Sequence, residues 1–165
     1  MDRDVIISFE DFGFQYDAQA EPTLHNINLQ IRKGEKVLIA GPSGCGKSTL
    51  AHCINGLVPG SYPGKISGKL TVAGKDAVEL GLFGLPKIIG TVLQDSDGQF
   101  IGLTVAEDIA FALENDCVPT EEMRRQVEKV AELVDVKSVL HRAPHEISGG
   151  QKQRVGLGGV MVGQV

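Results

Sequence analysis

Short runs of alternating apolar and polar residues open the chain. The segment from Ile6 to Tyr16 alternates around Ile7 and Phe9, and residues 27–31 read Ile-Asn-Leu-Gln-Ile. A period of two is typical of strands with one buried face. The pattern therefore predicts two strands, which we expect to pair antiparallel.

Two further runs are apolar without alternation. One is Val37 to Ala40, which ends at Gly41, and the other is Ile88 to Leu93. Continuous apolar runs are typical of strands buried on both faces of a parallel sheet. We expect both to be such strands. The Gly- and Pro-rich stretch from Pro59 to Gly68 predicts a loop, followed by a short strand at residues 70–72.

Three stretches carry helix signals. A helix is expected from near Lys47 to Gly56, which is suited to the C-cap. Thr104 and Glu107 are spaced as a capping box, which predicts a helix to about Asn115. Another helix is expected from Thr120, because apolar residues recur on one face: Met123, Val127, Val130, Ala131 and Val134.

Composition narrows the class of protein. With 165 residues, 42% hydrophobic and 22% charged, the chain can form one ordinary globular core. A net charge of −5 argues against a nucleic-acid partner. Its three cysteines favour neither a disulfide framework nor a zinc site, and they fit a reducing cytosol. No apolar run reaches the length of a membrane span, so we expect no direct membrane insertion.

The strongest chemical signal is a glycine-rich loop between a predicted strand and a predicted helix. Residues 41–48 read GPSGCGKS and fit the phosphate-binding pattern GxxxxGK[ST]. Lys47 would reach the β and γ phosphates of a nucleotide, and the Ser48 hydroxyl would bind Mg²⁺. A turn that merely caps a helix is the alternative, and Cys45 fits a small filler better than a nucleophile. The predicted nucleotide-binding residues here are Gly41, Pro42, Ser43, Gly44, Cys45, Gly46, Lys47, Ser48 and Thr49.

A second motif selects among the families that use such a loop. Residues 147–151, Ile-Ser-Gly-Gly-Gln, resemble the LSGGQ signature of ABC ATPases, with Ile147 in place of Leu. The resemblance implies that the signature contacts the γ-phosphate of ATP held by a facing cassette. Ser148 suits a helix N-cap, and two glycines would expose amides at the positive end of the helix dipole. An ordinary Ser-Gly-Gly helix cap is the alternative. The residues implied are Ser148, Gly149, Gly150 and Gln151.

Two other positions match this family in order and approximate spacing. Tyr16 resembles the aromatic residue that stacks on adenine, although an isolated Tyr in a strand would more often pack in the core. Gln94 resembles the Q-loop glutamine, which implies catalytic and metal roles through Mg²⁺ and the attacking water. A lone Gln at a strand end is otherwise simply solvated.

The surroundings of Gln94 resemble one branch of the family in particular. Residues 94–100 and 104–111 are similar to energy-coupling-factor cassettes, which power bacterial uptake of vitamins and metal ions, and residues 55–59 and 65–68 are similar too. Within that branch the chain looks like the first cassette of the double-cassette form linked with thiamine-precursor import. The likeness runs from about Val5 onward.

The resemblance implies an α/β fold, with a P-loop NTPase core of the RecA type. It adds an N-terminal antiparallel β subdomain and part of an α-helical signature subdomain. We expect the core and β subdomain at about residues 1–93 and the helical subdomain at about 94–165. The family's Walker B strand, D-loop and switch histidine come later than Arg154 and match nothing here. We therefore expect an incomplete N-terminal portion of one cassette that is marginally stable or self-associating.

The implied function is an ATP-binding and ATP-hydrolysing subunit of an energy-coupling-factor importer of small solutes. The implied cofactors are ATP and Mg²⁺. The implied partners are a second cassette and transmembrane coupling and substrate-binding subunits, at the cytoplasmic face of the cell membrane. Two alternatives stay open: a soluble ABC ATPase outside transport, and a nucleotide-binding or dimerisation fragment that does not itself hydrolyse ATP.

Overall fold

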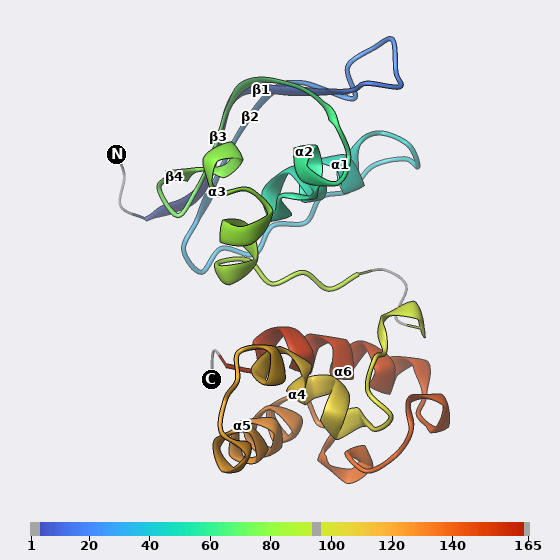
Figure 1. Cartoon of the computed structure of the whole chain (residues 1–165). Coiled ribbons are helices and arrows are strands. Elements are labelled where there is room, and N and C mark those ends of the chain that lie inside the picture. Colours follow the sequence, from blue (N-terminus) through green and yellow to red (C-terminus); the bar gives the residue numbers. More distant parts are fainter. Residues whose placement is uncertain (1–3, 94–96, 164–165) are drawn as a thin grey trace. The chain divides into compact units, whose positions relative to one another are not determined.

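A computed structural model of the protein describes residues 4–93 and 97–163. The chain divides into two compact units, Met1–Ile89 and Gly90–Val165 (Figure 1). Among the described residues, the first holds the strands, three short α-helices and the 3-10 helix η1 (Leu85–Lys87), and the second is helical. None of the helices in these described ranges has both the length and the apolar character needed to cross a bilayer.

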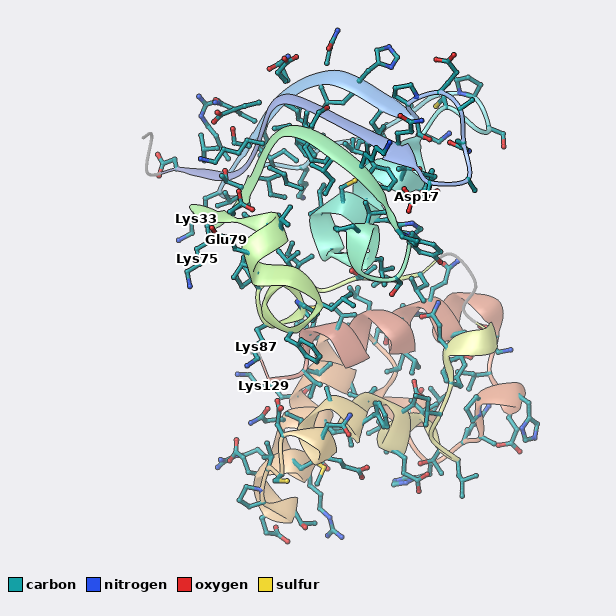
Figure 2. The ribbon with its side chains drawn as sticks, turned by 45° about the horizontal axis from the view of Figure 1, so that its top comes forward. Asp17, Lys33, Lys75, Glu79, Lys87 and Lys129 are labelled. Carbon is teal, nitrogen blue, oxygen red and sulfur yellow. The ribbon has the colours of Figure 1, made fainter. Side chains whose placement is uncertain are left out.

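The first unit is built on a four-stranded sheet. Its strands are β1 (Val5–Tyr16), β2 (Leu24–Arg32), β3 (Gly64–Val72) and β4 (Lys75–Asp76), in the order β2-β1-β3-β4. Every described pairing is antiparallel, which confirms the prediction for β1 and β2. The two ends of the sheet are distinct in Figure 2, with Asp17 at one end and Lys33, Lys75 and Glu79 at the other.

A bulge in β1 keeps its aromatic residues on one face. Phe9, Phe12 and Phe14 are each no more than 2% exposed, although strict alternation would put Phe12 on the opposite face from Phe9. The ladder shifts register between Phe9 and Phe12, and Asp11 there has a φ of 46°. One extra residue thus returns Phe12 to the core. Gly68 lies opposite, where an added Cβ would come within 2.2 Å of the Asp11 carbonyl oxygen.

Helices cover the buried face of this sheet. They are α1 (Lys47–Asn55), α2 (Leu57–Gly60) and α3 (Ala77–Gly84). The prediction of α1 is confirmed, with Gly56 as its C-cap. Residues from the helices and strands share one core, which includes Leu50, Cys53, Leu70 and Leu85. The helix α3 was not predicted; its N-cap Asp76 accepts hydrogen bonds from two backbone amides.

Three expectations about the first ninety or so residues are wrong. Residues 37–40 pair with none of the described strands, and Leu38 is 90% exposed. Residues 88–93 are likewise outside the sheet, with Leu93 about half exposed. An apolar run becomes a buried strand only where neighbours pair with it and layers cover it, and the described residues supply neither. The stretch 59–68 is only partly loop, because β3 begins at Gly64, which pairs with Tyr16.

The second unit packs three helices around a core of its own. These are α4 (Val105–Asn115), α5 (Thr120–Leu133) and α6 (Gly149–Met161), joined by 3-10 turns such as η3 (Lys137–Val139) and η4 (Pro144–Glu146). The predicted capping box is present, since the Glu107 amide donates to the Thr104 hydroxyl (3.3 Å) and the Thr104 amide to the Glu107 carboxylate (3.2 Å). Both predicted helices are confirmed.

Small residues let these helices approach closely. Gly158 of α6 is buried, and an added Cβ would lie 3.2 Å from Val130 and 3.4 Å from Ile109. The side chains of Val105, Ile109, Val130, Val136 and Val155 are completely buried. The middle of α6 is therefore fixed in a tightly packed core, and this holds the first turn of the helix in place.

Candidate functional site

The glycine-rich loop in the first unit ends at an uncapped helix N-terminus. Gly44 and Gly46 have φ values of 81° and 94°, in the left-handed region that favours glycine. Gly46 is the N-cap of α1, and no side chain of the described residues hydrogen-bonds to that cap. An added Cβ at Gly46 would lie 3.0 Å from the Leu24 side chain. The loop therefore turns sharply and leaves first-turn amides of α1 available to an external anion.

Lys47, the first residue of α1, folds back over this loop. Its Nζ donates to the carbonyl oxygens of Gly41 (2.9 Å) and Pro42 (2.6 Å). It also lies 3.7 Å from the sulfur of Cys45, which is exposed. An added Cβ at Gly41 would come within 2.8 Å of that sulfur. The ammonium group is thus held at the mouth of the loop, where a phosphate bound to the amides would meet it.

Tyr16 reaches the same helix from the end of β1. Its hydroxyl is 3.0 Å from the Thr49 hydroxyl, and its ring packs edge-on to Phe14 with centroids 4.7 Å apart. Thr49 is only 7% exposed. Thr49 is one of the predicted nucleotide-binding residues, and in the structure its hydroxyl also contacts the Tyr16 hydroxyl. No sequence signal points to this contact, because 33 residues separate the two.

A polar loop forms a wall beside the glycine-rich loop. The Gln15 amide donates to the carbonyl oxygens of Gln19 (2.8 Å) and Ala20 (3.1 Å), and the Thr23 hydroxyl donates to the Gln19 side chain (2.6 Å). A hollow of about 480 Å³ is lined by residues 19–23 together with Gly44 and Cys45. It offers space for the part of a ligand that extends beyond its phosphates.

The signature residues lie in the second unit, at the start of α6. Ser148 is the N-cap, as predicted: its hydroxyl accepts from the Gln151 amide (3.3 Å), and its own amide donates to the Gln151 side chain (2.9 Å). Ile147 is buried and anchors the turn in the core of the second unit. An added Cβ at Gly149 or Gly150 would meet nothing within 4 Å. A side chain at either position would therefore not clash with the described residues. The space above the two glycines is open, so an outside group could approach their amides.

The structure brings together Tyr16, Thr49 and the glycine-rich loop in the first unit, and Ser148 to Gln151 in the second. Gln94 lies outside the described residues. Over residues 4–93 and 97–163, no three His, Cys, Asp or Glu side chains gather as metal ligands. The exposed Ser48 hydroxyl is nevertheless a fitting ligand for Mg²⁺, an ion that usually binds through substrate phosphates and only one or two protein groups.

Burial also separates the cysteines. It raises the pKa of the Cys53 thiol from 9.0 to about 12. Cys53 is 3% exposed, on the buried face of α1, whereas Cys45 and Cys117 are exposed. Cys53 is therefore an apolar packing residue and takes no part in the candidate site.

Comparison with known proteins gives consistent matches. The family profile described as ABC transporter matches residues 24–165. A protein described as an ABC transporter ATP-binding protein from Streptococcus mutans is 59% identical over 156 residues, which are 94% of this chain and 28% of that protein. One from Enterococcus faecalis is 60% identical over 159 residues, or 96% of this chain and 28% of that protein. One from Clostridium perfringens is 59% identical over 165 residues, or 100% and 29%.

A solved structure agrees with the sequence matches. It is that of cbiO1 from Clostridium perfringens, described as part of the ABC transporter complex cbiONQ. Its TM-score is 0.85 at 32% identity, and the alignment covers 96% of this chain and 62% of that one. The present chain spans less than a third of the length of the three curated relatives.

Proposed function

The chain belongs to the ABC transporter family, and from this premise we propose that it is the nucleotide-binding part of a subunit that couples ATP to solute transport. One observation carries the proposal. The uncapped start of α1, the Lys47 ammonium and the Tyr16 ring lie together in one compact unit. A phosphate site and an aromatic surface in that arrangement suit a nucleoside triphosphate.

Each residue of the loop has a distinct task in this proposal. The amides of residues 41–49 surround the phosphates, and Lys47 neutralises the charge of the β and γ groups. Ser48 would hold Mg²⁺ through its hydroxyl group. Tyr16 stacks on the base. Bound Mg²⁺ would stabilise the negative charge that develops on the phosphoryl oxygens.

The second unit acts on a different nucleotide. We propose that Ser148, Gly149, Gly150 and Gln151 meet the γ-phosphate held by a facing cassette, with the positive end of the α6 dipole directed at it. The open space over both glycines supports this role. Gln94 is proposed to reach Mg²⁺ and the attacking water. Closure of two cassettes around ATP would then move the membrane subunits, and hydrolysis would reset them.

The finer proposal is an energy-coupling-factor importer at the cytoplasmic face of the membrane. The likeness to cbiO1, itself described as part of a transporter complex, supports it. Exposed apolar side chains in the second unit, Ile101 (65% exposed) and Leu103 (82%), offer a surface for a transmembrane partner. Co-purification of the full-length protein with transmembrane subunits would favour transport, whereas co-purification with ribosomes or DNA would favour a soluble ABC ATPase.

Titration calorimetry with Mg-ATP tests nucleotide binding. We expect micromolar binding by the chain and at least tenfold weaker binding by Lys47→Ala, because a hydrogen bond to a charged group is worth about 1.5–3 kcal/mol, or roughly 10- to 150-fold in affinity. The exposed Lys36 gives a matched control, and Lys36→Ala should bind as the unmodified chain does. Equal binding by Lys47→Ala and the unmodified chain would refute the assignment of the phosphate site.

Hydrolysis is a separate question. We propose that the full-length protein hydrolyses ATP and that this chain alone does not. Steady-state hydrolysis by the isolated chain that disappears in Lys47→Ala would overturn the second half of that proposal.

A further inference from the structure

We propose that Arg154 is a positioning residue, which holds the signature turn through Asp135 in the orientation that the phosphate of the facing cassette requires. Arg154 lies on α6, one helical turn after Gly150. Its role rests on the proposed function, because the signature acts only when a second cassette brings its nucleotide to α6. Arg154 would restrain this turn in addition to the Ser148 cap, through its contact with Gly150.

A single guanidinium joins the signature turn to the end of another helix. The Arg154 Nη1 donates to the Asp135 carboxylate (2.6 Å) and to the Asp135 carbonyl oxygen (3.2 Å). Its Nε lies 3.4 Å from the Gly150 carbonyl oxygen. The side chain thus contacts the backbone at two places, Gly150 in the signature turn and Asp135 after α5. Its planar, rigid fork suits this arrangement, which the single ammonium of lysine cannot reproduce.

Local hydrogen bonds hold the backbone around Asp135 in place. Asp135 lies two residues after the end of α5 and has a φ of 56°, in the left-handed region that aspartate tolerates better than most residues. Its amide donates to the Glu132 carbonyl oxygen (3.2 Å), and the next amide, that of Val136, donates to the Ala131 carbonyl oxygen (2.8 Å). The Val136 side chain is completely buried. Arg154 therefore ties the signature turn to backbone that is anchored in the core.

The link is poorly suited to a general stabilising role. The side chains of Arg154 and Asp135 are 42% and 91% exposed, and exposed ion pairs contribute little to global stability. The α6 helix is already held by completely buried Val155 and by the Ser148 cap. The Arg154 contacts add a constraint on the orientation of Gly150. Orientation matters for phosphoryl transfer, because a misplacement of about 1 Å can cost about 100-fold in rate.

The experiment uses the full-length protein and four variants: Arg154→Ala, Arg154→Lys, Asp135→Ala and the double alanine variant. For each we would measure kcat, the Kd of Mg-ATP and the midpoint of thermal unfolding. We expect Arg154→Ala to lower kcat about tenfold or more, because the misplaced turn loses contact in the transition state. The Kd should change less than twofold, because the protein's own P-loop is untouched. Arg154→Lys should not restore kcat.

Asp135 distinguishes a link between two residues from two separate effects. Asp135→Ala should lower kcat less than Arg154→Ala, because the Asp135 carbonyl oxygen remains as an acceptor. Adding it to Arg154→Ala should have no further effect, since the shared contact is already lost. Arg125→Ala is the matched control, an exposed arginine of the same unit that pairs with Glu122. It should leave kcat unchanged.

The role of Arg154 would be overturned by an unchanged kcat in Arg154→Ala, by a restored kcat in Arg154→Lys, or by additive losses in the double variant. A lowered kcat with an equal loss of Mg-ATP affinity would overturn it too, because the effect would then lie in the P-loop. Failure of the proposed function looks different. In that case the unmodified protein would not hydrolyse ATP, or Lys47→Ala would hydrolyse it at the full rate. Either result would also refute the proposed role of Arg154.

Discussion

The contact between Tyr16 and Thr49 gives a prediction whose magnitude follows from burial. Tyr16→Phe removes one hydroxyl and leaves the Thr49 hydroxyl, on a side chain that is 7% exposed, without its 3.0 Å partner. A net hydrogen bond is worth about 1 kcal/mol, and an unpaired buried polar group costs about 1–3 kcal/mol. We expect Tyr16→Phe to lower the free energy of unfolding by about 1–2 kcal/mol.

A double-mutant cycle isolates this contact. Thr49→Val should cost less than Tyr16→Phe, because the half-buried Tyr16 hydroxyl can still reach water. The double variant should be about 1 kcal/mol more stable than the sum of the two single losses predicts, since the hydroxyl left unpaired in each single variant is gone. Urea unfolding followed by circular dichroism measures all four proteins. Additive losses would refute the reasoning, because the two hydroxyls would then contribute independently.

Two variants of Tyr16 separate the contribution of its hydroxyl to nucleotide binding from that of its ring. Tyr16→Phe keeps the aromatic surface, so its Mg-ATP affinity should stay within about twofold of the unmodified chain. Tyr16→Ala removes the ring as well, and the loss of base stacking, about 1–3 kcal/mol, should weaken binding roughly 5- to 150-fold. Equal affinities for Tyr16→Ala and Tyr16→Phe would show that the ring does not stack on the base.

Two further predictions concern the stability of the fold. Because folding raises the pKa of the buried Cys53 thiol from 9.0 to about 12, its contribution to stability is complete below about pH 9 and is lost as the pH rises toward 12. The urea midpoint should therefore fall more steeply over that range than in Cys53→Val, and parallel pH profiles would contradict this. Ser148→Ala removes the N-cap of α6 and should cost about 1 kcal/mol, whereas Ser148→Thr should cost less. Thermal unfolding measures both, and equal midpoints for the two variants would argue against capping by the hydroxyl.

Local signals predicted most of the elements. The capping box at Thr104, the N-cap at Ser148 and the apolar stripe of α5 depend on residues within a few positions of one another, so they can be read along the chain. The antiparallel pair β1–β2 was also readable from its alternation. The predicted fold class and family resemblance are confirmed by the profile match and by the likeness to cbiO1.

The failures depend on context that a pattern does not contain. Residues 37–40 are apolar enough for a buried strand, yet burial needs partners on either side, and Leu38 remains 90% exposed among the described residues. At Gly64, pairing with Tyr16 prevails over a composition typical of loops. The contacts of Thr49 and of Asp135 with their partners span 33 and 19 residues, beyond the reach of any local motif.

The position of Lys47 affects the enthalpy that ATP binding would release. Its ammonium already donates to two carbonyl oxygens of its own loop, at 2.9 and 2.6 Å. An arriving phosphate must exchange those partners for its own oxygens. A hydrogen bond from the ammonium to a charged phosphate oxygen is stronger than one to a neutral carbonyl oxygen, so the exchange favours the ligand. The carbonyl oxygens of the loop thus compete with the ligand for the Lys47 ammonium, and the heat released on binding would be smaller than the new phosphate contacts alone would give.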